Sequence, residues 1–299
     1  MNPLARYLDP EALNQLGGRP IEPGALVLGN LAGSHRSPLA GFAVEFAGHR
    51  EYVRGDDPRH VDWRLYYTRD KLFIKQYEME TNFVCHLVLD VSASMRYGEG
   101  ASNKLGYAAK LATTLGYAIV RQNDKVSLAT IDERVRGFIP PGHTMAQIHR
   151  MTLHLDEVPP DHQTRLADCL GELTGRMGRR AIVMIFSDFF SEPDELEPAL
   201  QQFRFRNHEV VLFQVLHPDE REFRLSGMTK FVGLEAEGED LTQAEDVRGA
   251  YLEALAEHRR RLGDVCHRNR IELVPIDTGR PAAESLVDYL DRRQRVRRR

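Results

Sequence analysis

The hydrophobic positions of this chain form two kinds of pattern that alternate along it. Short, nearly continuous apolar runs occupy residues 84–89, 126–131, 181–186, 210–216 and 271–276. Between them lie longer stretches with apolar residues every three or four positions, at residues 104–120, 143–155, 165–173, 191–205, 244–268 and 283–292. Continuous runs are typical of strands buried on both faces, and the longer spacing is typical of helices that cover a sheet. The alternation predicts an α/β fold with a doubly wound, mostly parallel sheet.

The run at residues 84–89 stops abruptly at an acid and two hydroxyls. Asp90 lies at the predicted carboxyl end of the strand, and Ser92 and Ser94 lie on the loop that follows. This spacing lets the carboxylate and both hydroxyls turn toward one point. Such oxygen-only ligands suit Mg²⁺ or Mn²⁺ and not zinc or copper. The alternative is an ordinary strand exit or helix cap, which uses the same residue types.

A second buried run, at residues 181–186, also ends in a hydroxyl and an acid, Asp188. In the interval between the two runs, Thr164 directly precedes a helical pattern, although Thr144 and Thr152 lie in the same interval. Two strands that end in aspartates can meet at the switch point of an open α/β sheet, where such sheets place their ligands. The sequence therefore predicts a metal site assembled from two strand ends.

This order of parts resembles the von Willebrand factor A fold and its metal-ion-dependent adhesion site. The pattern of that family is Asp-x-Ser-x-Ser, then a distant Thr and a distant Asp, and the matching residues here are Asp90, Ser92, Ser94, Thr164 and Asp188. The resemblance implies a non-enzymatic, metal-dependent protein-binding module. Its Mg²⁺ or Mn²⁺ would keep one coordination position open for an acidic side chain of a protein partner.

A charged segment at residues 42–77 contains a strong turn signal at residues 55–58 and the only tryptophan, Trp63. Taken alone, it predicts a hairpin with a solvated turn and a packed tryptophan. Its pattern Arg-x-Tyr-x-x-Gly-Asp-Asp-x-Arg-x-Val-x-Trp, followed by Asp-Val-Ser-Ala-Ser-Met, resembles domain-of-unknown-function family fifty-eight. Those proteins are von Willebrand factor A-like and often accompany MoxR-type AAA+ ATPases. The resemblance implies such an ATPase as a candidate partner, in protein assembly or metal insertion.

These features suggest three parts. We expect an N-terminal, strand- and loop-rich extension at residues 1–80, packed on a von Willebrand factor A-like domain at residues 81–292. A basic tail follows at residues 293–299. Basic runs can bind phosphate backbones or anionic lipid, but a solvated terminus is the interpretation we favour for one short patch.

Composition narrows the function classes. The chain has 299 residues and a formal net charge of −4, so its overall charge does not favour nucleic acid. Its three cysteines are scattered and are typical of buried apolar fillers in a reducing compartment. No apolar run reaches the roughly 20 residues that span a bilayer, and the first residues lack the apolar core of a signal peptide. We therefore expect a cytoplasmic protein with no membrane span.

Enzyme motifs are missing from the sequence. It contains no P-loop, no Gly-x-Ser-x-Gly elbow and no His-Glu-x-x-His arrangement. The alternative function is an Mg²⁺-dependent hydrolase that uses metal-bound water near Asp90 and Asp188. Its general base would come from unplaced residues such as His162 or Glu192.

Overall fold

The computed structural model describes residues 3–16, 21, 44–69, 71–79, 83–158, 164–178, 180–233 and 238–297. The described residues fall into two compact units. The larger lies within residues 1–29 and 83–299, and the smaller within residues 30–82. The predicted extension at residues 1–80 differs from these units, because the first two helices belong to the larger one.

The larger unit is built on a six-stranded sheet whose strands lie in the order β10-β7-β6-β3-β4-β5. These are β3 (Val84–Asp90), β4 (Lys125–Ile131), β5 (Val135–Gly142), β6 (Ile182–Ser187), β7 (Glu209–Leu216) and β10 (Glu272–Asp277). All neighbouring strands run parallel except β4 and β5. Counted along the chain within this sheet, the strands lie in the order 3-2-1-4-5-6, and the order reverses between β3 and β6. The predicted doubly wound, mostly parallel sheet is confirmed.

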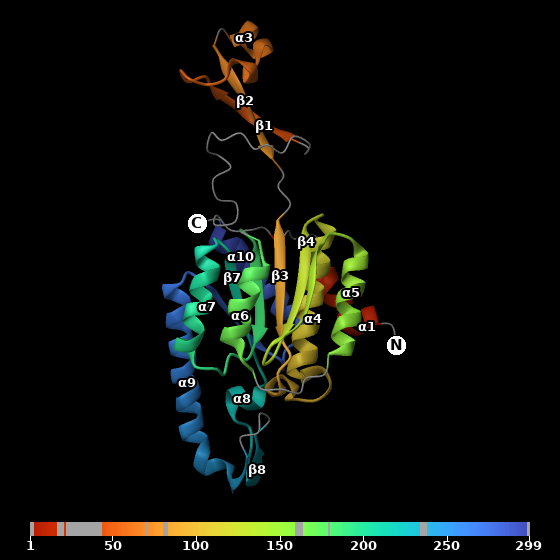
Figure 1. Cartoon of the computed structure of the whole chain (residues 1–299), viewed down its shortest axis with the longest axis vertical. Coiled ribbons are helices and arrows are strands. Elements are labelled where there is room, and N and C mark those ends of the chain that lie inside the picture. The colour runs from red at the N-terminus through yellow and green to blue at the C-terminus, as the bar shows by residue number, and fades with distance from the viewer. Residues whose placement is uncertain are drawn as a thin grey trace. The chain divides into compact units, whose positions relative to one another are not determined.

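Helices cover both faces of this sheet (Figure 1). One face carries α1 (Pro3–Tyr7), α2 (Pro10–Leu16), α4 (Lys104–Arg121), α5 (Met145–Glu157) and α10 (Ala282–Arg297). The other carries α6 (Leu166–Arg176), α7 (Pro193–Phe205) and α9 (Ala244–Arg268). On β3, Leu87 and Leu89 pack into the first core and Val88 into the second. This two-sided burial is why the strand reads as a continuous apolar run.

Local sequence signals account for the ends of several elements. The side chain of Asn103 accepts a hydrogen bond from the Gly106 amide and caps α4. Asp9 caps α2 in the same way, through bonds from the amides of Glu11 and Ala12. Cys85, Cys169 and Cys266 are all buried and unpaired, as expected of apolar fillers. Among the described residues, no helix has the length and apolar character needed to cross a bilayer.

The helix α10 continues past the point where the sequence predicted a basic tail. Arg293 is buried in this helix, and its guanidinium contacts Glu209 Oε1 at 2.5 Å and Tyr289 Oη at 3.2 Å. Its Nη1 also lies 3.8 Å from Glu272 Oε2. The tail assignment at residue 293 therefore differs from the structure, because Arg293 neutralises carboxylates from two strands.

A short helix and a hairpin lie at one end of the larger unit, beside the first turns of α9 (Figure 1). The helix is α8 (Pro218–Glu222), and the hairpin pairs β8 (Met228–Val232) with β9 (Glu239–Gln243). The 3-10 turns η2 (Ala93–Arg96) and η3 (Gly100–Ser102) connect β3 to α4.

The smaller unit is an antiparallel hairpin of β1 (Val44–Glu51) and β2 (Phe73–Met79), with the 3-10 turn η1 (Pro58–His60) and α3 (Trp63–Arg69) between them. Asp56 holds the turn by pairing with Arg50 and accepting a bond from the Val53 amide. The hairpin prediction is thus confirmed. Trp63, expected to be packed, is 55% exposed. Packing of this segment on the larger unit stays a prediction.

Candidate metal site

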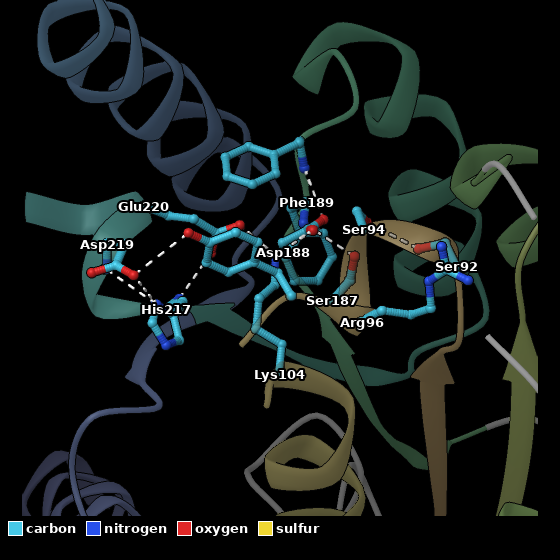
Figure 2. Close-up of polar contacts among 12 residues, drawn as sticks. Ser92, Ser94, Arg96, Lys104, Ser187, Asp188, Phe189, His217, Asp219 and Glu220 are labelled. Atoms are coloured by element: carbon cyan, nitrogen blue, oxygen red, sulfur yellow. Dashed lines mark hydrogen bonds and ion pairs between the residues drawn. The ribbon is translucent and has the colours of Figure 1, made fainter. Parts of the chain in front are cut away.

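Asp90 lies at the carboxyl end of β3, with no exposed surface. Its Oδ1 accepts a bond from the Ser92 amide at 2.9 Å, and its Oδ2 accepts one from Ser187 Oγ at 2.6 Å. The hydroxyl oxygens of Ser92 and Ser94 are 3.1 Å apart (Figure 2). Burial, and then the charge of Asp188, raise the pKa of the Asp90 carboxyl. Ser92 thus lies against a buried carboxylate, and Ser94 lies against Ser92.

Asp188 follows β6, the strand next to β3 across the switch point. Its side chain is almost fully buried, and Oδ1 accepts a long bond of 3.4 Å from the Phe190 amide. The neighbouring Phe189 has a left-handed backbone (φ 56°) and a buried ring. Phe190 is instead 42% exposed. One of the two rings after Asp188 is therefore part of the core and the other lies at the surface.

Thr164 is partly buried and lies two residues before the first residue of α6. The next residue, Arg165, donates its amide to the Asp132 carbonyl at 2.9 Å. Asp132 directly follows β4, the neighbour of β3, so Thr164 lies at the same edge of the sheet as Asp90. Its role as a metal ligand stays a prediction. Residues 159–163, which directly precede it, lie outside the described residues.

Two other polar groups at this edge escaped the sequence prediction. Asp132 is another acid directly after a buried strand, the signal used for Asp90, but its carboxylate pairs with Arg136 Nε at 2.5 Å. Ser187 bonds Asp90 Oδ2 and also accepts a bond from the Phe189 amide at 3.0 Å. It therefore joins the two strand ends.

The most important residue that sequence reasoning missed is Lys104. It is the first residue of α4, it has no exposed surface, and Figure 2 shows it beside Asp188 and Glu220. Its Nζ donates to Asp188 Oδ2 at 2.8 Å and to Glu220 Oε1 at 2.7 Å. Burial opposes the charged ammonium, but the two carboxylates outweigh burial and raise the pKa of Lys104. A lysine at a helix start opposes the helix dipole, and this was an available signal.

Glu220 belongs to α8 and is also bound to its own helix start. Its Oε2 accepts a bond from the His217 amide at 2.8 Å, which forms half of a capping box. Burial raises the pKa of Glu220, and the Lys104 charge opposes that rise. Lys104 therefore connects the acid of β6 to the cap of α8.

The donor set at this edge fits a hard divalent cation. Mg²⁺ binds oxygen at about 2.0–2.1 Å in an octahedron, so two adjacent ligand oxygens lie about 3 Å apart. The two serine hydroxyls have that separation. In the described part of the chain, no group of three or more His, Cys, Asp and Glu could hold a metal. A metal here would therefore have to use the serine hydroxyls together with Asp90 and Asp188.

The larger unit is therefore a doubly wound α/β domain with an Asp-x-Ser-x-Ser loop at the switch point of its 3-2-1-4-5-6 sheet. Residues 48–261 match the family described as "Protein of unknown function DUF58". The match covers most of the chain, and the protein belongs to this family.

Among curated proteins, the chain is similar to uncharacterized proteins of Mycobacterium bovis and Mycobacterium tuberculosis. Each is 24% identical over 276 residues, which covers 89% of this chain and 85% of the relative.

Among solved structures, it is similar to an aerotolerance-related membrane protein of Bacteroides fragilis, with 16% identity and a TM-score of 0.45. It is also similar to the hypothetical protein BatB of Bacteroides thetaiotaomicron, with 14% identity and a TM-score of 0.46. Each match covers 71% of this chain and 98% of the other. The VWA domain of SpRpn10 matches with 10% identity, a TM-score of 0.43 and coverage of 70% and 95%.

Proposed function

We propose that this protein is a non-enzymatic, metal-dependent protein-binding module. Mg²⁺ or Mn²⁺ binds at the sheet edge through Ser92, Ser94 and Thr164, with Asp90 and Asp188 acting directly or through water. One coordination position is left for a carboxylate of a partner protein. A hard cation with few direct carboxylate ligands stays electrophilic, and it favours an incoming anionic oxygen.

One observation carries this proposal. Two serine hydroxyls 3.1 Å apart lie beside a buried carboxylate, at the switch point where a second buried aspartate follows the adjacent strand. Burying two acids beside each other is costly unless a cation neutralises them. Lys104 lies against Asp188, whereas the hydrogen bonds to the Asp90 carboxylate in the described part of the chain come from neutral groups of Ser92 and Ser187. A metal ion at the serines would neutralise Asp90.

The partner surface includes Phe190, whose exposed ring lies two residues after Asp188 and can add apolar contact beside an ionic anchor. The family resemblance makes a MoxR-type AAA+ ATPase the candidate partner, in protein assembly or metal insertion. The cytoplasm is the proposed location. The partner assignment rests on that resemblance alone, and a pull-down with and without chelator would test it.

The alternative function, an Mg²⁺-dependent hydrolase, needs a general base. Glu192 is tied to Arg261 at 2.9 Å, and His162 lies outside the described residues. A Ser–His–Asp arrangement does occur, since His217 lies 3.2 Å from Ser102 Oγ and 3.3 Å from Asp219.

Its hydrogen bonds run in the wrong direction for catalysis. His217 Nδ1 accepts the Asp219 amide at 3.2 Å, which leaves the proton of the neutral ring on Nε2. Nε2 then donates to Ser102, whose own proton goes to the Glu99 carbonyl at 2.9 Å. This ring cannot accept the serine proton, so the binding module is the better-supported function.

Calorimetric titration with MgCl₂ and MnCl₂ tests the proposal. The wild type should bind one divalent ion, while Asp90→Ala and Ser94→Ala should lose at least about tenfold in affinity, because each removes an oxygen of the site. Ser102→Ala is the matched control, since it removes a serine hydroxyl from the same loop but outside the site. Equal uptake by the wild type and Asp90→Ala would exclude the site.

A further inference from the structure

The position of Lys104 is unfavourable in two respects. Its ammonium is fully buried, and it occupies the first position of an 18-residue helix, where acidic side chains are favoured. Burial of a charge and opposition to the helix dipole both disfavour a cation here. Violations of local rules of this kind tend to occur at functional sites. Two carboxylates from distant parts of the chain offset the cost, Asp188 and Glu220.

We propose that the Lys104 ammonium is a permanent positive charge that sets the net charge of the metal site. Glu220 shares this ammonium with Asp188 and thereby sets how far the charge of Asp188 is neutralised. This inference rests on the proposed metal site and concerns its selectivity. Lys104 is a positioning residue and not a metal ligand. It holds Asp188 by one carboxylate oxygen, and Glu220 shares the same ammonium.

The charge balance shows what this arrangement does. Asp90, Asp188 and Glu220 oppose one ammonium, so the cluster has a formal net charge of −2 when all four groups are ionised. One divalent ion makes the cluster neutral, whereas a monovalent ion leaves a buried negative charge. A neutral centre with an ammonium behind Asp188 also accepts a partner's carboxylate at lower electrostatic cost than a negative centre would.

The same contacts connect the metal site to α8. Glu220 caps α8 through the His217 amide while it binds Lys104. Lys104 also lies 5.3 Å from the centre of the exposed Phe190 ring. The ammonium therefore contacts the acid of the site, the cap of a neighbouring helix and the ring on the proposed partner face.

Three variants separate a charge-setting role from a purely structural one. Lys104→Met makes the cluster −3, Glu220→Gln makes it −1, and the double variant returns it to −2. Calorimetry with MgCl₂ and MnCl₂ at pH 8 keeps the carboxylates ionised, and melting temperatures report folding. Even at an effective dielectric constant of about 20, one charge within about 10 Å of a divalent ion changes affinity by more than about tenfold.

We expect Lys104→Met to bind the ions at least about tenfold more tightly and Glu220→Gln at least about tenfold more weakly. The double variant should bind within about threefold of the wild type. Shifts of the two single variants in the same direction, or no shifts, would overturn the inference and leave the metal site intact. If Lys104→Met does not fold, Glu220→Gln and the double variant decide the matter by the same criteria. Absence of binding by the wild type would instead refute the proposed function itself.

Discussion

His86 provides a quantitative prediction for how stability depends on pH. It lies inside β3, 3% exposed, with Nδ1 2.6 Å from Ser127 Oγ and its ring stacked on Phe138. Burial, and to a lesser degree the nearby His208, lower the pKa of His86 from its ordinary 6.5 to about 3. The folded state therefore keeps this ring neutral under conditions in which the unfolded chain protonates it.

The direction of this pH dependence follows from the linkage between proton binding and folding. Because the folded pKa lies below the unfolded one, stability is fully present above pH 6.5 and falls as the pH drops toward 3. The free energy lost by pH 5 is RT ln(1 + 10^1.5), or about 2 kcal/mol. In a chain of this size, that corresponds to about 4–8 °C in melting temperature.

Urea unfolding of the wild type and His86→Asn at pH 8 and pH 5 measures this contribution. Asparagine keeps a polar atom near the position of Nδ1 but does not titrate. The wild type should lose about 2 kcal/mol more than the variant between the two pH values, since the other acids and histidines are common to both. If the two proteins lose the same free energy, burial does not hold this histidine neutral and the reasoning fails.

Two further predictions follow from burial and ion pairing. Arg293→Met should lower the free energy of unfolding, measured with urea, by about 3 kcal/mol, because it removes the common partner of Glu209 and Glu272. Substitution of the exposed neighbour, Arg292→Met, should change the free energy of unfolding by less than about 0.5 kcal/mol. Equal effects of the two substitutions would mean that the tail is solvated from Arg293 onward. Phe189→Ala should lower the free energy of unfolding by about 3–5 kcal/mol, because the ring is buried. Phe190→Ala should leave the melting temperature unchanged and weaken Mg²⁺-dependent capture of the partner. Normal capture per folded molecule by Phe190→Ala would place the partner face elsewhere.

Much of the fold follows from local patterns. The predicted strand at the start of the Asp90 motif is β3, and the long periodic helix at residues 244–268 coincides with α9. The capped helix after Asn103 is α4. The strand β9 was missed, because its residues 239–243 are mostly polar and exposed and lack the apolar signal of a buried strand. The last turns of α10 were assigned to a basic tail, because a run of arginines is typical of a solvated segment when its acidic partners are not known.

The sequence by itself determined which residues are chemically able to form a metal site and which segments end at it. Buried runs, caps and the Asp-x-Ser-x-Ser spacing are encoded within a few residues, because side-chain direction repeats every two residues in a strand and every 3.6 in a helix. Only the tertiary structure decided which charges meet. Lys104 finds its partners 84 and 116 positions away, and Ser187 reaches Asp90 across 97 positions. Such pairings depend on strand order and helix docking, which no local period specifies.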